Sequence, residues 1–99
     1  MQFSDIGLSD LTNIASERPA VWVQPKDYEI VGAVLAVARR KANLTQFDLA
    51  RRLGRPQSVV SQYEAGKRRV DVVEFLLIVR ILGADPHHVF AEIVSSLTK

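Results

Sequence analysis

The stretch Thr45–Gly66, TQFDLARRLGRPQSVVSQYEAG, contains two short helical patterns joined by a turn that includes a glycine. In the first pattern, Leu49, Ala50 and Leu53 form an apolar stripe with helical spacing. Gly54 follows where such a helix ends, because glycine readily adopts the left-handed conformation after a last helical turn. The stretch therefore predicts two consecutive short helices separated by a tight turn.

The second pattern, residues 57–65, has a buried side and a polar side. Helical spacing places Val60 and Tyr63 on the buried side. At about 100° per residue, the opposite side groups four neutral hydrogen-bonding side chains within roughly 140° of one another. These are Gln57, Ser58, Ser61 and Gln62. Amides and hydroxyls at the start of a helix suit hydrogen bonding to base edges in the major groove of DNA.

The composition is that of one small globular domain. The chain has 99 residues, of which 47% are hydrophobic, enough for one compact core. It has no cysteine, which excludes disulfides and thiolate metal sites and fits a reducing cytosol. No apolar run approaches the roughly 18–20 residues of a membrane-spanning helix, and the N-terminus lacks a secretory signal pattern. We expect a soluble cytoplasmic protein that contacts no membrane.

The charge is distributed unevenly along the chain, although the net charge is only +2. Residues 1–38 carry a net charge of −3, residues 39–69 carry +7 and residues 70–99 carry −2. The positive charge thus brackets the two predicted helices. A basic surface of this kind is either solvated without a partner or faces a polyanion. Its coincidence with the polar helix face favours the polyanion, and in particular nucleic acid.

A longer helix is predicted before this stretch, over residues 27–42. Asp27 is its expected N-cap, and Glu29 places negative charge in its first turn. Asn43 then takes a left-handed conformation, and Thr45 caps the next helix. The apolar face of the 27–42 helix consists of Ile30, Val31, Val34, Leu35 and Ala38.

Two further helices are predicted after it. Asp71 and Glu74 form a capping-box pattern at the start of the first, which Gly83 ends. Asp85 caps the second, with Pro86 at its first position. The predicted buried stripe of the first is Val72, Phe75, Leu76, Val79 and Leu82. The predicted buried stripe of the second is Val89, Phe90, Ile93, Val94 and Leu97.

Residues 1–26 are interpreted as an N-terminal extension, and residues 27–99 as the domain. Within the extension, Leu8–Ala15 has the spacing of a short helix. Ala20–Val23 suits a short strand or an extended arm that stops at Pro25, and Trp22 is expected to anchor it on the core or on a second subunit. The extension is a candidate dimer or partner contact.

The residues quoted so far resemble a known family. LTQFDLARRLGRPQSVVSQYEAGKR, followed by an apolar helix and LGADP, closely resembles the phage repressor and Cro-like helix-turn-helix domain, also called Xre-like. The resemblance covers roughly residues 28–95 and implies an all-α fold of five helices, here with a short N-terminal extension. It also implies that the third helix lies in the major groove and that a dimer binds paired half-sites.

The resemblance assigns roles to individual residues. It places an ion pair between Arg39 and Glu64 that holds the recognition helix in position. Gln46 is expected to bond a phosphate and to brace Gln57, which can pair with adenine N6 and N7. The other expected base-reading residues are Ser58, Ser61 and Gln62, and the expected phosphate contacts beyond the helix are Lys67, Arg68 and Arg69.

Two positions depart from the family pattern. The residue before Gln57 is commonly Ser, Thr or Gly, but here it is Pro56, which can occupy the first helical position but supplies no side-chain cap. Arg55 in the turn is expected to compensate by reaching a phosphate. Phe47 stands at a position that is usually polar and exposed. It either folds back on the edge of the core, which we favour, or marks a partner contact.

Nothing in the sequence suggests catalysis. His87 and His88 are adjacent on a helix, so their side chains diverge by about 100°, and no further histidine or cysteine lies near them to complete a metal site. There is no glycine-rich phosphate loop and no nucleophile–base arrangement. We expect no enzyme activity, no metal and no cofactor.

These observations predict a sequence-specific DNA-binding transcriptional regulator. We expect a repressor that binds double-stranded DNA at an inverted repeat as a homodimer. The main alternative is the antitoxin of a toxin–antitoxin pair, which autoregulates through the same domain while residues 1–26 contact the toxin. An adaptor that uses the fold for protein contacts alone is a third class, which the polar face of the third helix disfavours.

Overall fold

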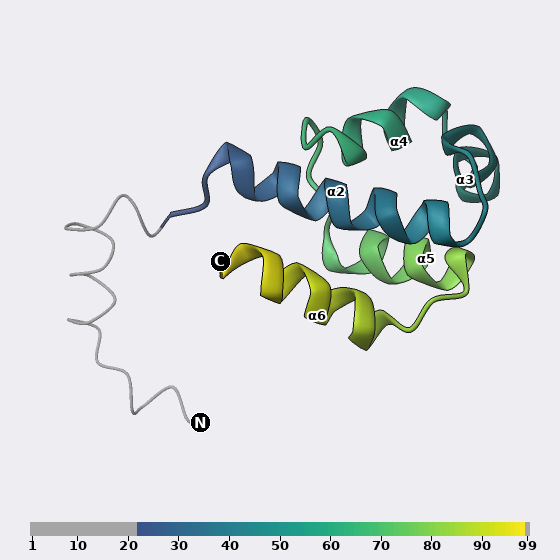
Figure 1. Cartoon of the computed structure of the whole chain (residues 1–99). Coiled ribbons are helices and arrows are strands. Elements are labelled where there is room, and N and C mark those ends of the chain that lie inside the picture. The colour runs from purple at the N-terminus through teal and green to yellow at the C-terminus, as the bar shows by residue number, and fades with distance from the viewer. Residues whose placement is uncertain (1–21, 99) are drawn as a thin grey trace.

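The computed structural model describes residues 22–98, and this part of the chain contains five α-helices and no strand. The helices are α2 (Pro25–Lys41), α3 (Gln46–Leu53), α4 (Gln57–Glu64), α5 (Val72–Leu82) and α6 (Pro86–Leu97). In Figure 1, α2 crosses the middle of the domain, α4 lies above it, α5 and α6 lie below it and α3 stands at one end. The predicted all-α, five-helix architecture is confirmed.

Helix α2 begins earlier than predicted. Pro25 is its first residue and Gln24 its N-cap, whereas we expected Asp27 as the N-cap and Pro25 as the end of an extended segment. The ring of proline fixes φ near the helical value and lacks the N–H that a first turn cannot pair, so Pro25 starts the helix. Asp27 contributes differently, since its carboxylate accepts a 2.8 Å hydrogen bond from the backbone N–H of Gln24.

The remaining helix ends follow the local sequence signals. The hydroxyl of Thr45 accepts a hydrogen bond from the N–H of Asp48, and the side chain of Asp71 accepts one from the N–H of Glu74. Asn43, Gly54 and Gly83 end their helices at positive φ, as predicted. Asp85 caps α6, ahead of Pro86. Side-chain caps of this kind each stabilise a helix by about 1 kcal/mol.

All five helices contribute buried side chains to the core. Ile78, Val60 and Val79 are its largest fully buried side chains, and each such residue stabilises the fold by about 1.5–3 kcal/mol relative to an exposed one. Val59 is also buried, which the predicted pattern did not include. The other buried members of the core are Leu35, Leu49, Ala50, Tyr63, Leu82 and Val89.

The predicted buried stripes of α5 and α6 are partly wrong. On α5, Val72 and Leu76 are exposed, and Ile78 is buried instead. On α6, only two members of the predicted stripe are buried, and the exposed ones are Phe90, Val94 and Leu97. Each of these helices buries one narrow side against its neighbours, and no other described element covers the rest.

Two aromatic side chains lie elsewhere than expected. Trp22 is 77% exposed, so it does not anchor on the core of the described domain. Phe47 is 63% exposed, so it does not fold back on the core edge. The predicted helix at Leu8–Ala15 lies outside the described residues, as do the first two residues of the Ala20–Val23 segment; Trp22 and Val23 form no strand. None of the described helices is long and apolar enough to cross a membrane.

Candidate nucleic-acid interface

The two helices α3 and α4 form a helix-turn-helix through residues 54–56. Gly54 has φ 67°, a conformation that reverses the chain at little steric cost for glycine. Pro56 is the N-cap of α4, with an extended backbone and no side-chain cap, and Gln57 is the first helical residue. The sequence allows Pro56 at the first helical position; in the structure it lies one position earlier, at the N-cap.

The exposed side of α4 is polar, as predicted. Gln57, Ser58 and Gln62 are exposed and Ser61 is half-buried. Val59, Val60 and Tyr63 occupy the opposite, buried side. The four neutral hydrogen-bonding side chains therefore share one surface that other elements leave largely open.

A chain of hydrogen bonds connects this surface to the interior. Gln57 Nε2 donates to Gln46 Oε1 at 2.8 Å, and Gln46 Nε2 donates to Glu64 Oε1 at 2.8 Å. Glu64 also accepts from Arg39, from Nε at 2.7 Å and from Nη2 at 3.0 Å. The structure thus brings together four residues from α2, α3 and α4, whose bonded pairs are 11 to 25 positions apart in the sequence.

The ion pair between Arg39 and Glu64 is buried. Their side chains are 10% and 8% exposed, respectively. Arg39 Nη1 also donates to the carbonyl oxygen of Leu44 at 2.8 Å, so the guanidinium bridges α4 and the segment before α3. The hydrogen bond to Glu64 holds the pKa of Arg39 above its ordinary value, although burial acts in the opposite direction. The side chain of Arg39 is therefore a fixed structural cation.

The C-terminal end of α4 lies very close to α2. A Cβ atom added to Gly32 would collide with the backbone carbonyls of Tyr63 and Glu64. A Cβ atom on Gly66, which has φ 74°, would lie 2.6 Å from the Cα of Glu29. Only glycine permits these two approaches, and together they fix the depth at which α4 sits on α2.

The basic loop that follows α4, residues 67–69, is held by aromatic rings. The guanidinium of Arg68 lies over the ring of Tyr63, 5.8 Å from its centroid. The guanidinium of Arg69 lies 5.3 Å from the centroid of Tyr28 on α2. Cation–π contacts at exposed sites contribute about 0.5–1 kcal/mol each. They orient both guanidinium groups while leaving the residues exposed.

Tyr63 and Glu74 connect α4 to α5. The Tyr63 hydroxyl donates to Glu74 Oε2, while Glu74 Oε1 accepts from the backbone N–H of Asp71 at 3.0 Å. Burial, followed by this hydrogen bond, raises the pKa of Tyr63. The Asp71 N–H, followed by the Tyr63 hydroxyl, lowers the pKa of Glu74. Glu74, the third residue of α5 and a member of its capping box, thus also braces α4.

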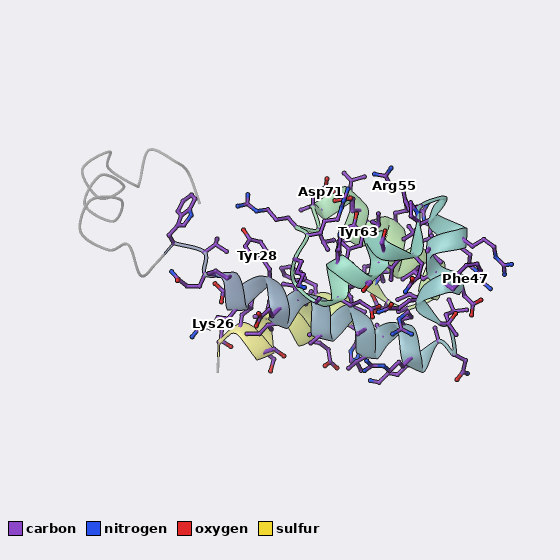
Figure 2. All side chains as sticks on the ribbon, turned by 90° about the horizontal axis from the view of Figure 1, so that it is seen from above. Lys26, Tyr28, Phe47, Arg55, Tyr63 and Asp71 are labelled. Atoms are coloured by element: carbon purple, nitrogen blue, oxygen red, sulfur yellow. The ribbon has the colours of Figure 1, made fainter. Side chains whose placement is uncertain are left out.

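Arg55 does not take part in the hydrogen bonds that join Gln57, Gln46 and Glu64. It is exposed and lines a small hollow with Tyr63 and Glu74. Figure 2 shows Asp71 and Arg55 along one edge of the domain, with Tyr63 further inward and Phe47 at one end. Arg55 therefore belongs to the side of the interface that carries α5, whereas Gln46 and Gln57 belong to the side that carries α2 and α3.

Sequence reasoning missed two residues of this arrangement. Tyr28, which holds Arg69, gave no signal because it lies near the start of α2, far from the motif. The sequence identifies Glu74 as a member of a capping box with Asp71, but its second partner, Tyr63, follows only from the packing of α5 beside α4. On α6, the Nε2 atom of His88 lies 3.3 Å from the Oε1 atom of Glu92. Residues 22–98 contain no cluster of three or more candidate metal ligands.

Comparison with known proteins agrees with this geometry. Residues 30–90 match the family described as a helix-turn-helix domain. An Xre-family-like protein from Pseudomonas syringae pv. tomato has a similar structure, with a TM-score of 0.63 and 41% sequence identity over 71% of this chain and 85% of that chain. The chain belongs to the Xre-like helix-turn-helix family.

A second solved structure is similar to this Xre-like chain. It is that of the clp gene regulator ClgR from C. glutamicum, with a TM-score of 0.67 and 26% identity over 74% of this chain and 95% of that chain. No curated protein sequence matches the chain. Family membership places the chain among DNA-binding proteins of the transcription-regulator class.

Proposed function

We propose that this Xre-like chain is a sequence-specific repressor that binds an inverted repeat in double-stranded DNA as a homodimer. The observation that carries the proposal is the hydrogen-bonded chain from Arg39 through Glu64 and Gln46 to Gln57. It holds an amide at the first position of a helix whose exposed side is polar. Such a helix is suited to the major groove, where the N-terminal residues of a recognition helix contact base edges.

The direction of the hydrogen bonds determines which atoms of Gln57 remain free. Glu64 can only accept, so Gln46 must turn its amide nitrogen toward Glu64 and its oxygen toward Gln57. Gln57 therefore uses one Nε2 hydrogen for Gln46, and its second hydrogen and its Oε1 stay available. One donor and one acceptor on the same amide match adenine N7 and N6.

The other polar residues of α4 extend this reading surface. Ser58 and Gln62 are exposed one helical turn apart, and Ser61 lies between them and α2. A hydroxyl can bond to several base edges, whereas a glutamine amide discriminates more strongly. We assign the strongest base preferences to Gln57 and Gln62 and weaker ones to the two serines.

Phosphate contacts are assigned to both flanks of the reading surface. Gln46 keeps one amide hydrogen beyond its bond to Glu64, which can reach a backbone phosphate on the α3 side. On the other flank we assign the exposed cations of the turn and of the basic loop, which are Arg55, Lys67, Arg68 and Arg69. The rings of Tyr63 and Tyr28 preorient two of these cations, which lowers the entropy lost on binding.

Selection of binding sites from random duplexes tests the proposal. The purified chain is expected to enrich two similar half-sites in inverted orientation, with centres about 10–10.5 base pairs or a multiple of that apart. Affinity for the selected site should fall steeply as salt concentration rises. Enrichment of no motif, or binding that salt leaves unchanged, would contradict sequence-specific recognition.

The antitoxin alternative can be tested with the same protein. An antitoxin would bind its own promoter and would also form a stable complex with the product of a neighbouring gene. Co-expression followed by pull-down distinguishes this case from a repressor that acts alone. Repression itself is tested by a reporter placed behind the selected site, whose output should fall when the chain is expressed.

A further inference from the structure

Helices α2 and α6 form an apolar groove on the surface of the domain. In Figure 1 the two helices lie side by side, and the end of α6 is near the start of α2. The groove has a volume of about 440 Å³, and its aliphatic lining includes Ile30, Val34, Val37 and Val89. Val37 is 45% exposed, so the described residues leave the groove open to solvent. We call it the α2–α6 groove.

The α2–α6 groove carries a cation at one end. Lys41 is the last residue of α2, and His88 lies in the first turn of α6, so both line the same end of the groove. His88 Nε2 already lies 3.3 Å from Glu92 Oε1, whereas Lys41 forms no ion pair with any of residues 22–98. An occupant that is apolar along its length and acidic at one end would therefore match the groove.

One segment of this chain has the required pattern. Residues 8–15 lie outside the described residues, and their sequence places Leu8, Leu11, Ile14 and Ala15 within about 120° of one another on a helix. The polar residues between them fall on the other side. An isolated helix of this length is marginal in water, so it requires an apolar surface against which its stripe can pack.

The intervening chain is long enough for this segment to reach the groove. Residues 16–24 join it to the start of α2, and nine extended residues span up to about 30 Å. The α2 wall of the groove runs from Ile30 to Lys41, a length of about 16 Å, whereas a helix over residues 8–15 is about 12 Å long. The segment therefore fits within the groove. A short tether also gives it an effective concentration on the order of millimolar, so a modest affinity is sufficient.

Charge also favours this segment as the occupant. Residues 1–17 contain three acidic side chains, Asp5, Asp10 and Glu17, and no basic one. On the shortest path from the start of α2, residue 15 lies toward that start and Asp5 lies toward the other end of the helix. Asp5 is thereby directed to the end of the groove that carries Lys41, where opposite charges attract.

We propose that residues 8–15 of this chain dock as an amphipathic helix in the α2–α6 groove of the same molecule. The docked segment covers Val37 and gives α2 a further packing partner. No residue of α3, α4 or the basic loop lines the groove, so docking leaves the proposed DNA-binding surface free. The inference therefore goes beyond the proposed function and does not depend on it.

Hydrogen–deuterium exchange of the full chain tests the docking. In the parent, amides of residues 8–15 should exchange at least about tenfold more slowly than in an unstructured peptide, because a docked helix protects them. Val37→Glu should remove this protection, because it places a carboxylate in the apolar groove. The domain should stay folded, since Val37 is exposed and glutamate is a good helix former. Val73→Glu is the matched control, with the same change at a 75% exposed valine of α5 outside the groove.

A second pair of variants tests the segment itself. Leu11→Glu, on the apolar side of residues 8–15, should lose the protection, whereas Thr12→Glu, on the polar side, should keep it. Slow exchange of the α3 and α4 amides confirms that each variant is folded. Absence of protection in the parent, or protection that survives both Val37→Glu and Leu11→Glu, overturns the inference. Protection that rises with protein concentration also overturns it, because the groove would then hold the segment of a second copy.

Discussion

Gln57 at the start of α4 donates a 2.8 Å hydrogen bond to Gln46 at the start of α3, across the turn that joins the two helices. Gln46 in turn is oriented by Glu64, which can only accept hydrogen bonds. The side chain of Gln57, which we propose contacts a base, is therefore oriented by Gln46 and, through Gln46, by Glu64. In the proposed function, this arrangement makes Gln57 the contact residue and Gln46 the positioning residue, and the two roles can be tested independently.

Gln46→Ala is expected to reduce base discrimination even though Gln46 contacts no base. The change frees the amide of Gln57, so part of the roughly 1–3 kcal/mol of a bidentate contact with adenine is lost. Affinities for the selected site and for its single-base variants measure the loss. Gln57→Ala should abolish the preference at that base, and the double variant should resemble Gln57→Ala. Strictly additive losses would show that the two glutamines do not act together.

Glu64→Ala is expected to lower the free energy of unfolding by about 3–5 kcal/mol, because it leaves the buried guanidinium of Arg39 without its partner. Denaturant unfolding measures this change. Glu92→Ala is the matched control, since Glu92 pairs with His88 at an exposed site, where ion pairs contribute about 0–1 kcal/mol. Equal stability of the parent and Glu64→Ala would contradict the bracing role of the ion pair.

Gly32→Ala is expected to destabilise the domain, although glycine-to-alanine changes inside helices usually stabilise by about 0.5–1 kcal/mol. The added methyl group meets backbone carbonyls of α4, which cannot move aside as a flexible side chain would. Overpacking of this kind costs about 1–3 kcal/mol. The melting temperature should therefore fall. Ala33→Gly, at the exposed neighbouring position, should cost only the ordinary helix propensity.

Lys67→Ala is expected to weaken binding to all duplexes by a similar factor and to lower the slope of log K against log salt by about 1. The reason is that one fewer phosphate is neutralised and one fewer counterion is released. Titrations at several salt concentrations measure the slope. Lys41→Ala is the control, because Lys41 lines the α2–α6 groove, to which α3, α4 and the basic loop contribute no residue. A selective loss at one sequence would instead indicate that Lys67 contacts a base.

Glu74 is expected to make stability depend on acidic pH. Its hydrogen bonds from Asp71 and Tyr63 lower its pKa in the folded state relative to the unfolded state. The resulting stabilisation is therefore present above the ordinary carboxyl pKa of about 4.3 and is lost as pH falls through the lower folded value. Melting temperatures between neutral pH and about pH 3 should show a smaller acid-induced decrease for Glu74→Gln than for the parent. Parallel curves would show that another carboxylate is responsible.

The sequence alone determined the local features of this protein. Thr45, Asp71 and Asp85 cap their helices, and Gly54 and Gly83 end theirs, as the sequence predicts, because each depends on contacts between residues close in the chain. The helix-turn-helix could be predicted for the same reason, and the resemblance supplied the pairing of Arg39 with Glu64. The predicted start of α2 was wrong because the sequence contains two local start signals, and the helix begins at Pro25 rather than after Asp27.

Only the tertiary structure decided which apolar side chains are covered. The period of a helix shows that Val72 and Leu76, or Phe90 and Val94, lie on one side, but burial depends on whether another element packs there. The hydrogen bond between Tyr63 and Glu74 and the stacking of Arg69 on Tyr28 also required the packed fold. These contacts join residues that are distant in the sequence. Their energies depend on interatomic distances that a local sequence pattern does not specify.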